Sequence, residues 1–397
     1  MLFIFHKWND YENILPFATK SAAAGLITVA VSRAPLNTGN HLANGVEFPG
    51  ARDIDFSSIV YELKIRSRGL KKIFWTLLHF YSFVCRFFGI GLNRVNSALQ
   101  RFLTKGFAED FNRLLISFEW IIADHQLRRG IFPYDSIMKA ASTGSCKLAL
   151  MPHGVHLIDD EASGVYRRAY DNLQNTFSHL KCHFTRHPEA QRRIRDGERV
   201  IFTYPIRYSR DYFEQYLRVN NWVRNPLPSL RSVLICEHDY SRFKFEASDY
   251  DRLIAGLIAK GYIVTIKSHT RSNRKLAKYC NLYSTDNTTK LMLDAAIIII
   301  PWGTVFFDAA LLGRPIIWVP YLRRKPFQFY PEIEGVGFST TSADNTISNI
   351  RQTITNYDSA VALQDKAFDA FVHKYLNDGS NFIDAVAGEY NPYDRIH

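Results

Sequence analysis

Short apolar runs alternate with amphipathic segments along most of this chain. The first apolar run covers 2–5, an amphipathic stretch follows at 11–25, and a second apolar run covers 26–33. Further runs of the same kind lie at 119–126, 147–154, 182–185, 200–205, 232–237, 262–270, 281–285, 296–301 and 316–319. Strands that alternate with helices are typical of parallel sheets, so the pattern predicts an α/β protein.

Helices are expected between these runs. Amphipathic stretches with helical spacing lie at 131–142, 246–261, 288–295 and, as several helices, 345–387. Ser248 is placed to cap the second of these helices, and Gly261 to end it. The stretch from 206 to 230 has no regular period and contains an Asn-Pro-Leu-Pro run at 225–228, so we expect an irregular linker there.

The clearest unit lies at 297–321. An apolar run ends in Pro301-Trp302-Gly303-Thr304, and a short amphipathic helix, Gly313-Arg314-Pro315 and a second apolar run follow. This order predicts a strand–helix–strand unit of a parallel sheet. Free N–H groups at the start of a helix bind phosphate well, so the turn predicts a nucleotide-linked or phosphorylated ligand.

The length indicates more than one domain. A chain of 397 residues exceeds the usual size of a single domain. We expect an N-terminal domain at 1–215 with a helical insertion at about 59–118, and a second domain at 228–345. The segment 346–397 is expected to form helices that pack back across the domains.

The composition narrows the choice of partners. Hydrophobic residues make up 47% of the chain, which is enough for two cores, and the net charge of +11 favours anionic partners. Because no zinc-finger or RNA-binding signature accompanies this charge, we expect no nucleic-acid partner.

The five cysteines are scattered and lack metal-site spacing, and no Asp-x-Asp motif follows a strand. We therefore expect neither disulfides nor a bound metal. No signal peptide and no apolar run of about 18 residues is found, so we expect a cytoplasmic protein.

The segment 71–94 is aromatic and carries basic residues on its flanks. Such a segment can lie in a membrane interface, which would place the protein at the cytoplasmic face of the inner membrane. It can also be an insertion helix buried against the first domain, which is the interpretation that we favour. Both interpretations stay open.

Polar residues in the second half follow three strands of the expected sheet. Lys267, His269 and Arg271 follow the second strand, and they can neutralise phosphate. The residues expected to bind the donor molecule are Lys267, His269, Arg271, Trp302, Gly303, Thr304 and Asp308. Ordinary surface charge and a loop histidine are the competing interpretations.

Four residues are candidates for catalysis: His153, Asp159, Glu237 and Asp239. His153 ends a strand of the first half and can act as a general base near neutral pH, and Asp159 lies close behind it. Glu237 and Asp239 follow the first strand of the second half, where a carboxylate can be a base or a nucleophile. Helix-start charge for Asp159, and salt bridges for the other two carboxylates, are the alternatives.

These motifs resemble the GT-B glycosyltransferases. The likeness is carried by the His-Gly pair at 153–154, the Lys-x-His of 267–269, and the Gly-Thr-x-x-x-Asp-Ala-x-x-x-Gly-x-Pro run at 303–315. The nearest likeness is to transferases of bacterial surface polysaccharides, namely the CDP-glycerol glycerophosphotransferases of the teichoic-acid type and the Kdo transferases of capsule and lipopolysaccharide.

The resemblance implies two Rossmann-like domains that face a central cleft, with the acceptor on the first domain and the nucleotide donor on the second. It implies a metal-independent enzyme without a cofactor, in which His269 and Thr304 contact donor phosphates and His153 lies near the acceptor. The expected donors are CMP-Kdo, CDP-glycerol or a UDP-sugar. The expected acceptor is a glycan or lipid-linked glycan of a capsule, O-antigen or teichoic-type polymer.

Two other functions are kept. The UDP-N-acetylglucosamine 2-epimerases resemble the chain in their His-Gly pair and glycine-rich loop, although the long insertion is not expected in them. A non-catalytic protein that binds nucleotides with a GT-B framework is the third possibility.

Overall fold

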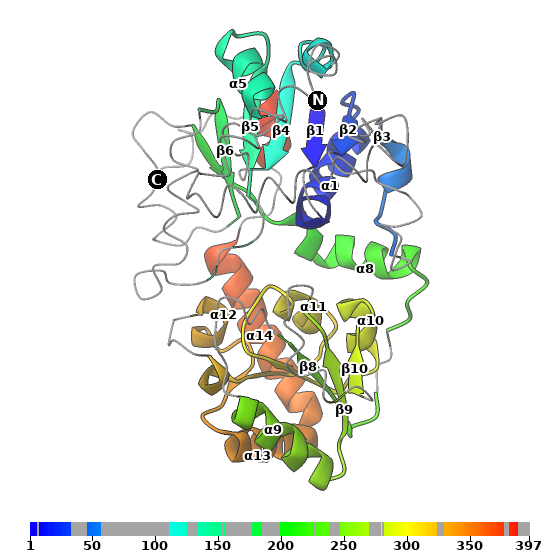
Figure 1. Cartoon of the computed structure of the whole chain (residues 1–397), viewed down its shortest axis with the longest axis vertical. Coiled ribbons are helices and arrows are strands. Elements are labelled where there is room, and N and C mark those ends of the chain that lie inside the picture. Colours follow the sequence, from blue (N-terminus) through cyan, green and yellow to red (C-terminus); the bar gives the residue numbers. More distant parts are fainter. Residues whose placement is uncertain are drawn as a thin grey trace, which may run out of the picture.

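The computed structural model contains two parallel sheets, one from each half of the chain (Figure 1). We call them the N-terminal sheet and the C-terminal sheet. The residues described are 1–5, 8–32, 46–56, 111–124, 134–152, 155, 157, 177–184, 199–224, 228–237, 247–269, 279, 282–323, 329–376 and 381–387.

The N-terminal sheet has seven strands in the order β3-β2-β1-β4-β5-β6-β7, and every neighbouring pair is parallel. Its central strands are apolar on both faces because helices cover them. The strands are β1 (Leu2–Phe5), β2 (Val29–Ser32), β3 (Asp55–Phe56), β4 (Trp120–Asp124), β5 (Lys147–Met151), β6 (Leu180–His183) and β7 (Val200–Phe202).

The C-terminal sheet has six parallel strands in the order β10-β9-β8-β11-β12-β13. The strands are β8 (Ser232–Cys236), β9 (Ile263–Lys267), β10 (Tyr283–Ser284), β11 (Ile297–Ile300), β12 (Ile316–Trp318) and β13 (Phe338–Ser339). Both sheets grow outward in two directions from a central pair, β1 and β4 or β8 and β11, as doubly wound nucleotide-binding sheets do. The predicted α/β fold with two Rossmann-like sheets is confirmed.

Helices cover these sheets and connect their strands. The helices are α1 (Trp8–Ala23), α5 (Tyr134–Ser142), α8 (Arg210–Val219), α9 (Ala247–Ala259), α10 (Thr288–Leu293), α11 (Phe306–Leu311), α12 (Tyr330–Ile333), α13 (Ala343–Thr355), α14 (Tyr357–Tyr375) and α15 (Asn381–Ala387). Short 3₁₀ turns lie at η2 (Ala51–Asp53), η3 (Ile206–Tyr208) and η5 (Pro320–Leu322).

Two details of the sequence prediction are wrong. The stretch expected to be irregular contains α8, whose N-cap Ser209 accepts a hydrogen bond from the N–H of Tyr212. This helix forms because four large side chains of one stripe, Tyr212 and Phe213 with Tyr216 and Leu217, are buried. Helix α9 begins at Ala247, so Ser248 lies in its first turn and is not its cap.

The C-terminal helices link the two sheets. Gln364 of α14 is buried and uses both ends of its amide, accepting from the N–H of Ile316 and donating to the carbonyl of Arg314. Phe382 of α15 packs instead against Phe3 and Phe17 beside the N-terminal sheet. Helix α15 therefore returns to the half where the chain begins (Figure 1). The exact domain limits stay a prediction.

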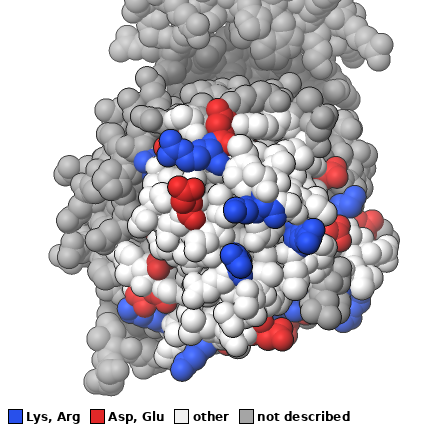
Figure 2. All heavy atoms as spheres, turned by 90° about the horizontal axis from the view of Figure 1, so that it is seen from below, with Lys and Arg blue, Asp and Glu red and all other residues white. Residues whose placement is uncertain are grey.

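The predicted insertion at 59–118 lies outside the described residues except for 111–118, and the segment 71–94 lies wholly outside them. Among the helices that are described, none is long and apolar enough to cross a membrane. On the lower end of the molecule, Lys and Arg side chains lie between Asp and Glu (Figure 2). Among the residues described on that face, the positive charge is therefore not gathered into one patch.

Two glycines before β13 test how tightly this edge of the C-terminal sheet is packed. Gly335 and Gly337 both have positive φ, 75° and 98°. A Cβ on Gly335 would meet nothing within 4 Å, whereas a Cβ on Gly337 would lie 2.7 Å from the carbonyl oxygen of Ile316 and 2.9 Å from the indole nitrogen of Trp318.

We predict that Gly335→Ala costs about 1–2 kcal/mol of unfolding free energy through backbone strain. Gly337→Ala should cost about 1–3 kcal/mol more, because the methyl group also forces β12 and β13 apart. Urea titration of both variants measures the difference. Equal losses would mean that β13 is not packed against β12 as closely as the structure has it.

Candidate functional site

The contacts between the two halves come from residues that follow the carboxyl ends of strands. The η3 turn comes soon after β7 and packs on α11, which follows β11. Leu157, beyond β5, accepts a hydrogen bond of 3.0 Å from the N–H of Tyr330, which lies beyond β12. The carboxyl ends of both sheets therefore face one junction, and in open α/β sheets ligands bind at such ends.

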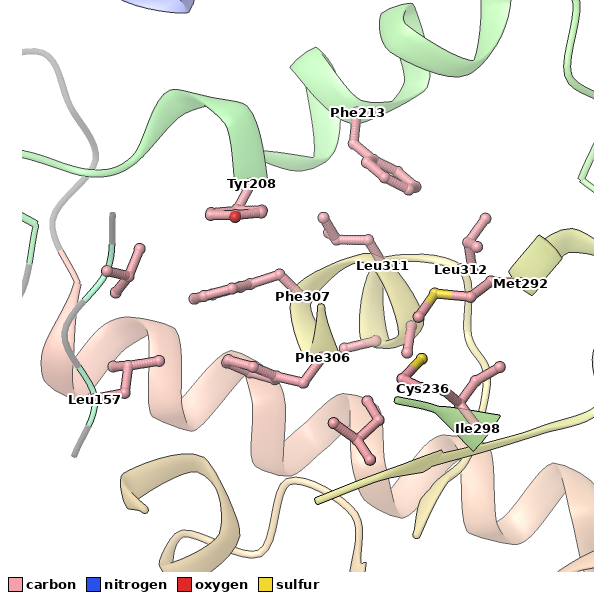
Figure 3. Packing of buried hydrophobic residues seen from close by; sticks show 14 of the residues in the cluster. Leu157, Tyr208, Phe213, Cys236, Met292, Ile298, Phe306, Phe307, Leu311 and Leu312 are labelled. Atoms are coloured by element: carbon pink, nitrogen blue, oxygen red, sulfur yellow. The ribbon is translucent and has the colours of Figure 1, made fainter. Parts of the chain in front are cut away.

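A column of aromatic rings fills this junction (Figure 3). The ring of Tyr208 stacks on Phe307 with centroids 4.2 Å apart and planes 13° apart, and Phe307 packs on Phe306 at 4.1 Å. Phe306 in turn meets Phe371 of α14 edge-on at 5.8 Å. The apolar core of one half thus continues into the other without a polar layer along this column.

A buried ion pair lies beside the column. Nη2 of Arg207 is 3.4 Å from Oδ2 of Asp308, and both residues are more than nine-tenths buried. The same Oδ2 accepts a hydrogen bond of 2.6 Å from the hydroxyl of Thr289. The pair therefore joins η3, which follows the N-terminal sheet, to α11 and α10 of the C-terminal half.

Aromatic rings enclose the guanidinium of Arg207. Its Cζ lies 4.3 Å from the ring centroid of Tyr216, 5.6 Å from that of Tyr208 and 5.7 Å from that of Phe213. Cations are attracted to such ring faces, and the attraction grows when water is excluded. The cation is thus held by one carboxylate and by three π faces.

Burial alone would lower the pKa of Arg207, but the carboxylate of Asp308, with smaller contributions from Tyr216, Tyr208 and Glu12, raises it above its ordinary value. Burial raises the pKa of both Tyr208 and Tyr216, and the charge of Arg207 opposes that rise. Arg207 is therefore charged, and both phenols are neutral, at any physiological pH.

These contacts give Asp308 a structural place. The sequence predicts a donor-binding role for this residue, and the structure puts its Oδ2 on Arg207 and Thr289. Its Oδ1 is buried and has no hydrogen-bond partner among the described residues. The role in donor binding stays a prediction.

The turn between β11 and α11 lies at the carboxyl end of the central strand pair of the C-terminal sheet. Trp302 is buried, whereas Gly303 has a φ of 121° and a Cβ added to it would meet nothing within 4 Å. Helix α11 begins only at Phe306.

This turn has backbone N–H groups that make no hydrogen bond to the described part of the chain. The carbonyls of Gly303 and Thr304 accept from the N–H groups of Phe306 and Phe307. Within the described part of the chain, the N–H groups of Gly303, Thr304 and Val305 donate to no protein acceptor. Three successive backbone donors at a strand end are suited to an anionic ligand.

Glu237 follows β8, the other strand of the central pair, and is only 4% exposed. Its Oε2 accepts hydrogen bonds from the hydroxyl of Tyr283 at 2.5 Å and from the N–H of His269 at 3.2 Å. Its Oε1 is buried and has no partner among the described residues. One oxygen of this carboxylate is therefore anchored and the other is unused.

Lys267 and His269 end β9 and begin the loop after it. The ammonium of Lys267 donates to the carbonyl of Ser268 at 2.8 Å and reaches that of Thr285 at 3.5 Å. Burial lowers the pKa of Lys267, and the neighbouring Cys236, Asp286 and Glu237 oppose this shift. Here Lys267 ties β9 to the strand beside it, and His269 contributes its backbone N–H to Glu237.

The structure thus brings seven of the predicted site residues onto the C-terminal half, at two adjoining places. Glu237, Lys267 and His269 adjoin at β8 and β9, and Trp302, Gly303, Thr304 and Asp308 follow β11. His153, Asp159, Asp239 and Arg271 lie outside the described residues. In the described ranges, no three His, Cys, Asp or Glu side chains gather as metal ligands.

Solved structures similar to this one span nearly the whole chain. The S. aureus MnaA–UDP complex has a TM-score of 0.58 at 11% identity, covering 98% of this chain and 97% of its own. A variant of the wall teichoic acid polymerase TagF has a TM-score of 0.52 at 13% identity, covering 98% of this chain and 87% of its own. The chain has the GT-B fold.

A third similar structure is the UDP-GlcNAc 2-epimerase from Neisseria meningitidis bound to UDP-GlcNAc. Its TM-score is 0.54 at 13% identity, and the match covers 94% of this chain and 98% of that one. No protein-family model matches the sequence, and no curated protein does. The GT-B fold therefore rests on three-dimensional likeness and on the strand order of both sheets.

Three residues of this region were not predicted from the sequence: Arg207, Tyr208 and Tyr283. Arg207 stands in a Tyr-Pro-Ile-Arg-Tyr run that resembles an ordinary turn, and Tyr283 lies in a two-residue strand. One signal was available, because Tyr204 and Tyr208 stand close to Arg207 in the sequence and cations are attracted to aromatic ring faces.

We predict that the ion pair of Arg207 and Asp308 is needed for folding of the whole chain. Asp308→Ala should lower the free energy of unfolding by about 3–5 kcal/mol, because it leaves a buried cation without its carboxylate. The double variant Arg207→Met with Asp308→Leu should be less destabilised than Asp308→Ala alone, since no charge is left buried.

Asp369→Ala provides the control. Asp369 pairs with Arg210 at 2.7 Å, but both side chains are more than half exposed, so its loss should cost under about 1 kcal/mol. Urea titration followed by circular dichroism measures all three. A loss for Asp308→Ala no larger than that for Asp369→Ala would contradict the structural role of the buried pair.

Proposed function

We propose that this protein is a glycosyltransferase, or a polyol-phosphate transferase, that moves its group from a nucleotide-activated donor to a bacterial surface glycan. The observation that carries the proposal is the central strand pair of the C-terminal sheet. Three unused backbone donors follow β11, and a buried carboxylate with one unused oxygen follows β8. These hydrogen-bond donors and this hydrogen-bond acceptor suit a phosphorylated nucleoside. Its phosphates offer oxygens to the N–H groups, and its N–H or O–H groups can donate to the carboxylate.

The phosphates of the donor are assigned to the turn at Gly303, Thr304 and Val305. Helix α11 has six residues, so we assign the contact to these N–H groups and not to a helix dipole. His269 and Arg271, in the loop after β9, supply further donors, and Lys267 holds that loop to its neighbour. Trp302, the residue before this turn, is buried.

The acceptor is assigned to the N-terminal half. His153 or Asp159 would take a proton from the acceptor hydroxyl, whose oxygen then attacks the sugar carbon or phosphorus of the donor, and Asp239 is kept as an alternative base. The nucleotide leaves with the negative charge, which the N–H groups of the turn stabilise. CMP-Kdo, CDP-glycerol and UDP-sugars are the donors proposed, and capsule, O-antigen or teichoic-type polymers the acceptors.

A peripheral membrane contact through 71–94 would bring a lipid-linked acceptor to the protein. This part of the proposal rests on the sequence alone, since the segment lies outside the described residues.

A sugar-nucleotide 2-epimerase is the second candidate. It is favoured by the similarity to MnaA and to the Neisseria meningitidis epimerase, which match this chain over nearly their whole length. An epimerase needs no acceptor. Formation of an epimer from UDP-GlcNAc alone, followed by NMR, would therefore decide for it and against transfer.

We predict that a nucleotide of the panel CMP, CDP, UDP and GDP raises the melting temperature, because a ligand that binds only the folded state stabilises it. At a concentration 100 times its dissociation constant, the gain is about 2.7 kcal/mol. CMP would indicate an acid-sugar donor, CDP a polyol-phosphate donor, and UDP a hexose donor or the epimerase.

His269→Ala tests the site itself. This variant keeps the backbone N–H that reaches Glu237, and it should lose most of the nucleotide-induced rise and the turnover. His373→Ala, at an exposed position of α14, is the control and should respond like the unchanged protein. No rise with any nucleotide would contradict the proposal, and binding without turnover of any donor would leave a non-catalytic binding protein.

A further inference from the structure

The unused oxygen of Glu237 is the most informative polar atom of the described chain. Buried acceptors are nearly always hydrogen-bonded in folded proteins, so an orphaned carboxylate oxygen indicates a partner that comes from outside the chain. Tyr283 and the N–H of His269 both donate to Oε2, which fixes the orientation of the carboxylate and leaves Oε1 free. Carboxylate oxygens accept hydrogen bonds, so the missing partner is a hydrogen-bond donor.

The order of strands shows which part of a bound nucleotide this oxygen would meet. Strand β8 lies between β11 on one side and β9 and β10 on the other. The N–H groups of 303–305 follow β11, whereas Glu237 is bonded to His269, beyond β9, and to Tyr283 of β10. A ligand that lies across the strand ends from β11 toward β9, with its phosphates on the β11 side, would bring its nucleoside toward Glu237.

We propose that Oε1 of Glu237 accepts a hydrogen bond from the nucleoside of the donor, from an N–H of the base or a hydroxyl of the ribose, and that Tyr283 positions the carboxylate. This inference rests on the proposed function and deepens it. It makes Glu237 a recognition residue, and not the base or nucleophile, because the carboxylate is anchored on the side of β8 away from the turn assigned to the reacting phosphate.

Glu237→Gln is the sharpest test. Because Tyr283 and His269 both donate, the amide oxygen must face them, and its NH₂ group must take the place of Oε1. The substitution thus turns an acceptor into a donor with almost no change in shape. We expect the dissociation constant of the best-bound nucleotide among CMP, CDP, UDP and GDP to rise about 10- to 100-fold, measured by calorimetry.

The 2′-deoxy and 3′-deoxy forms of the same nucleotide show whether the hydrogen bond to Glu237 comes from the ribose or from the base. If a ribose hydroxyl is the partner, one deoxy form binds the unchanged protein more weakly, and Glu237→Gln causes no further loss with that form. If an N–H of the base is the partner, both deoxy forms bind as the ribonucleotide does, and Glu237→Gln weakens all three alike.

Two matched controls exclude a general effect on folding. Glu334 also accepts a tyrosine hydroxyl at 2.5 Å, from Tyr375, so Glu334→Gln makes the same chemical change elsewhere and should leave the affinity unchanged. Tyr283→Phe should weaken binding by a smaller factor and add nothing to Glu237→Gln. Tyr279→Phe, which removes an equivalent bond to Asp251, should have no effect on affinity.

The outcomes separate this inference from the function on which it rests. Failure of the unchanged protein to bind any of the four nucleotides would overturn the proposed function and this inference with it. Nucleotide binding that is equally tight in Glu237→Gln and in the unchanged protein would overturn this inference alone. If Glu237→Gln does not fold, the tyrosine variants decide. Equal nucleotide affinity of Tyr283→Phe and Tyr279→Phe would then overturn this inference.

Discussion

The buried pair of Arg207 and Asp308 is the interaction on which the arrangement of the two halves depends. Removing two charges from water is costly, so such a pair penalises every arrangement in which either charge lacks its partner. Arg207 follows the last strand of the N-terminal sheet, and Asp308 lies in the helix that follows the central strand of the other. The pair can therefore form in only a few relative placements of the two sheets. The stacking of the Tyr208 ring on Phe307 restricts these placements further.

This arrangement divides the polar groups of the junction into two kinds. Some have partners within the protein. Lys267 donates to two carbonyls, and one oxygen of Asp308 contacts Arg207 and Thr289. Others have no hydrogen-bond partner among the described residues, and they include Oε1 of Glu237 and the N–H groups of the turn after β11. The first kind builds the site, and the second kind is where a ligand would find its contacts.

Much of the fold could be predicted from the sequence, because apolar runs and turn residues mark its strands and turns locally. The four isoleucines of β11, the Gly-Thr turn and the second apolar run at β12 lie where the strand–helix–strand unit was expected. Helix α8 was missed because its buried face is made of aromatic residues and its neighbourhood is rich in turn formers.

The polar part of the site was less accessible to sequence reasoning. In the sequence, Arg207 resembles a surface charge. Its contacts with the rings of α8 and the carboxylate of α11 arise only from tertiary packing. The unused oxygen of Glu237 is visible only once Tyr283, from a distant two-residue strand, is seen to bind the other oxygen. His153, Asp159, Asp239 and Arg271, outside the described residues, stay predictions.

Hydrogen–deuterium exchange of the full chain, with and without the nucleotide that stabilises it most, would test the central claim most directly. If the nucleotide lies across the central strands of the C-terminal sheet, amides of 233–237, 264–269 and 301–306 should exchange more slowly when it is bound. Peptides of β2 and β3, at the far edge of the N-terminal sheet, should be unchanged. Protection confined to the N-terminal sheet, or none in those three segments, would contradict the account.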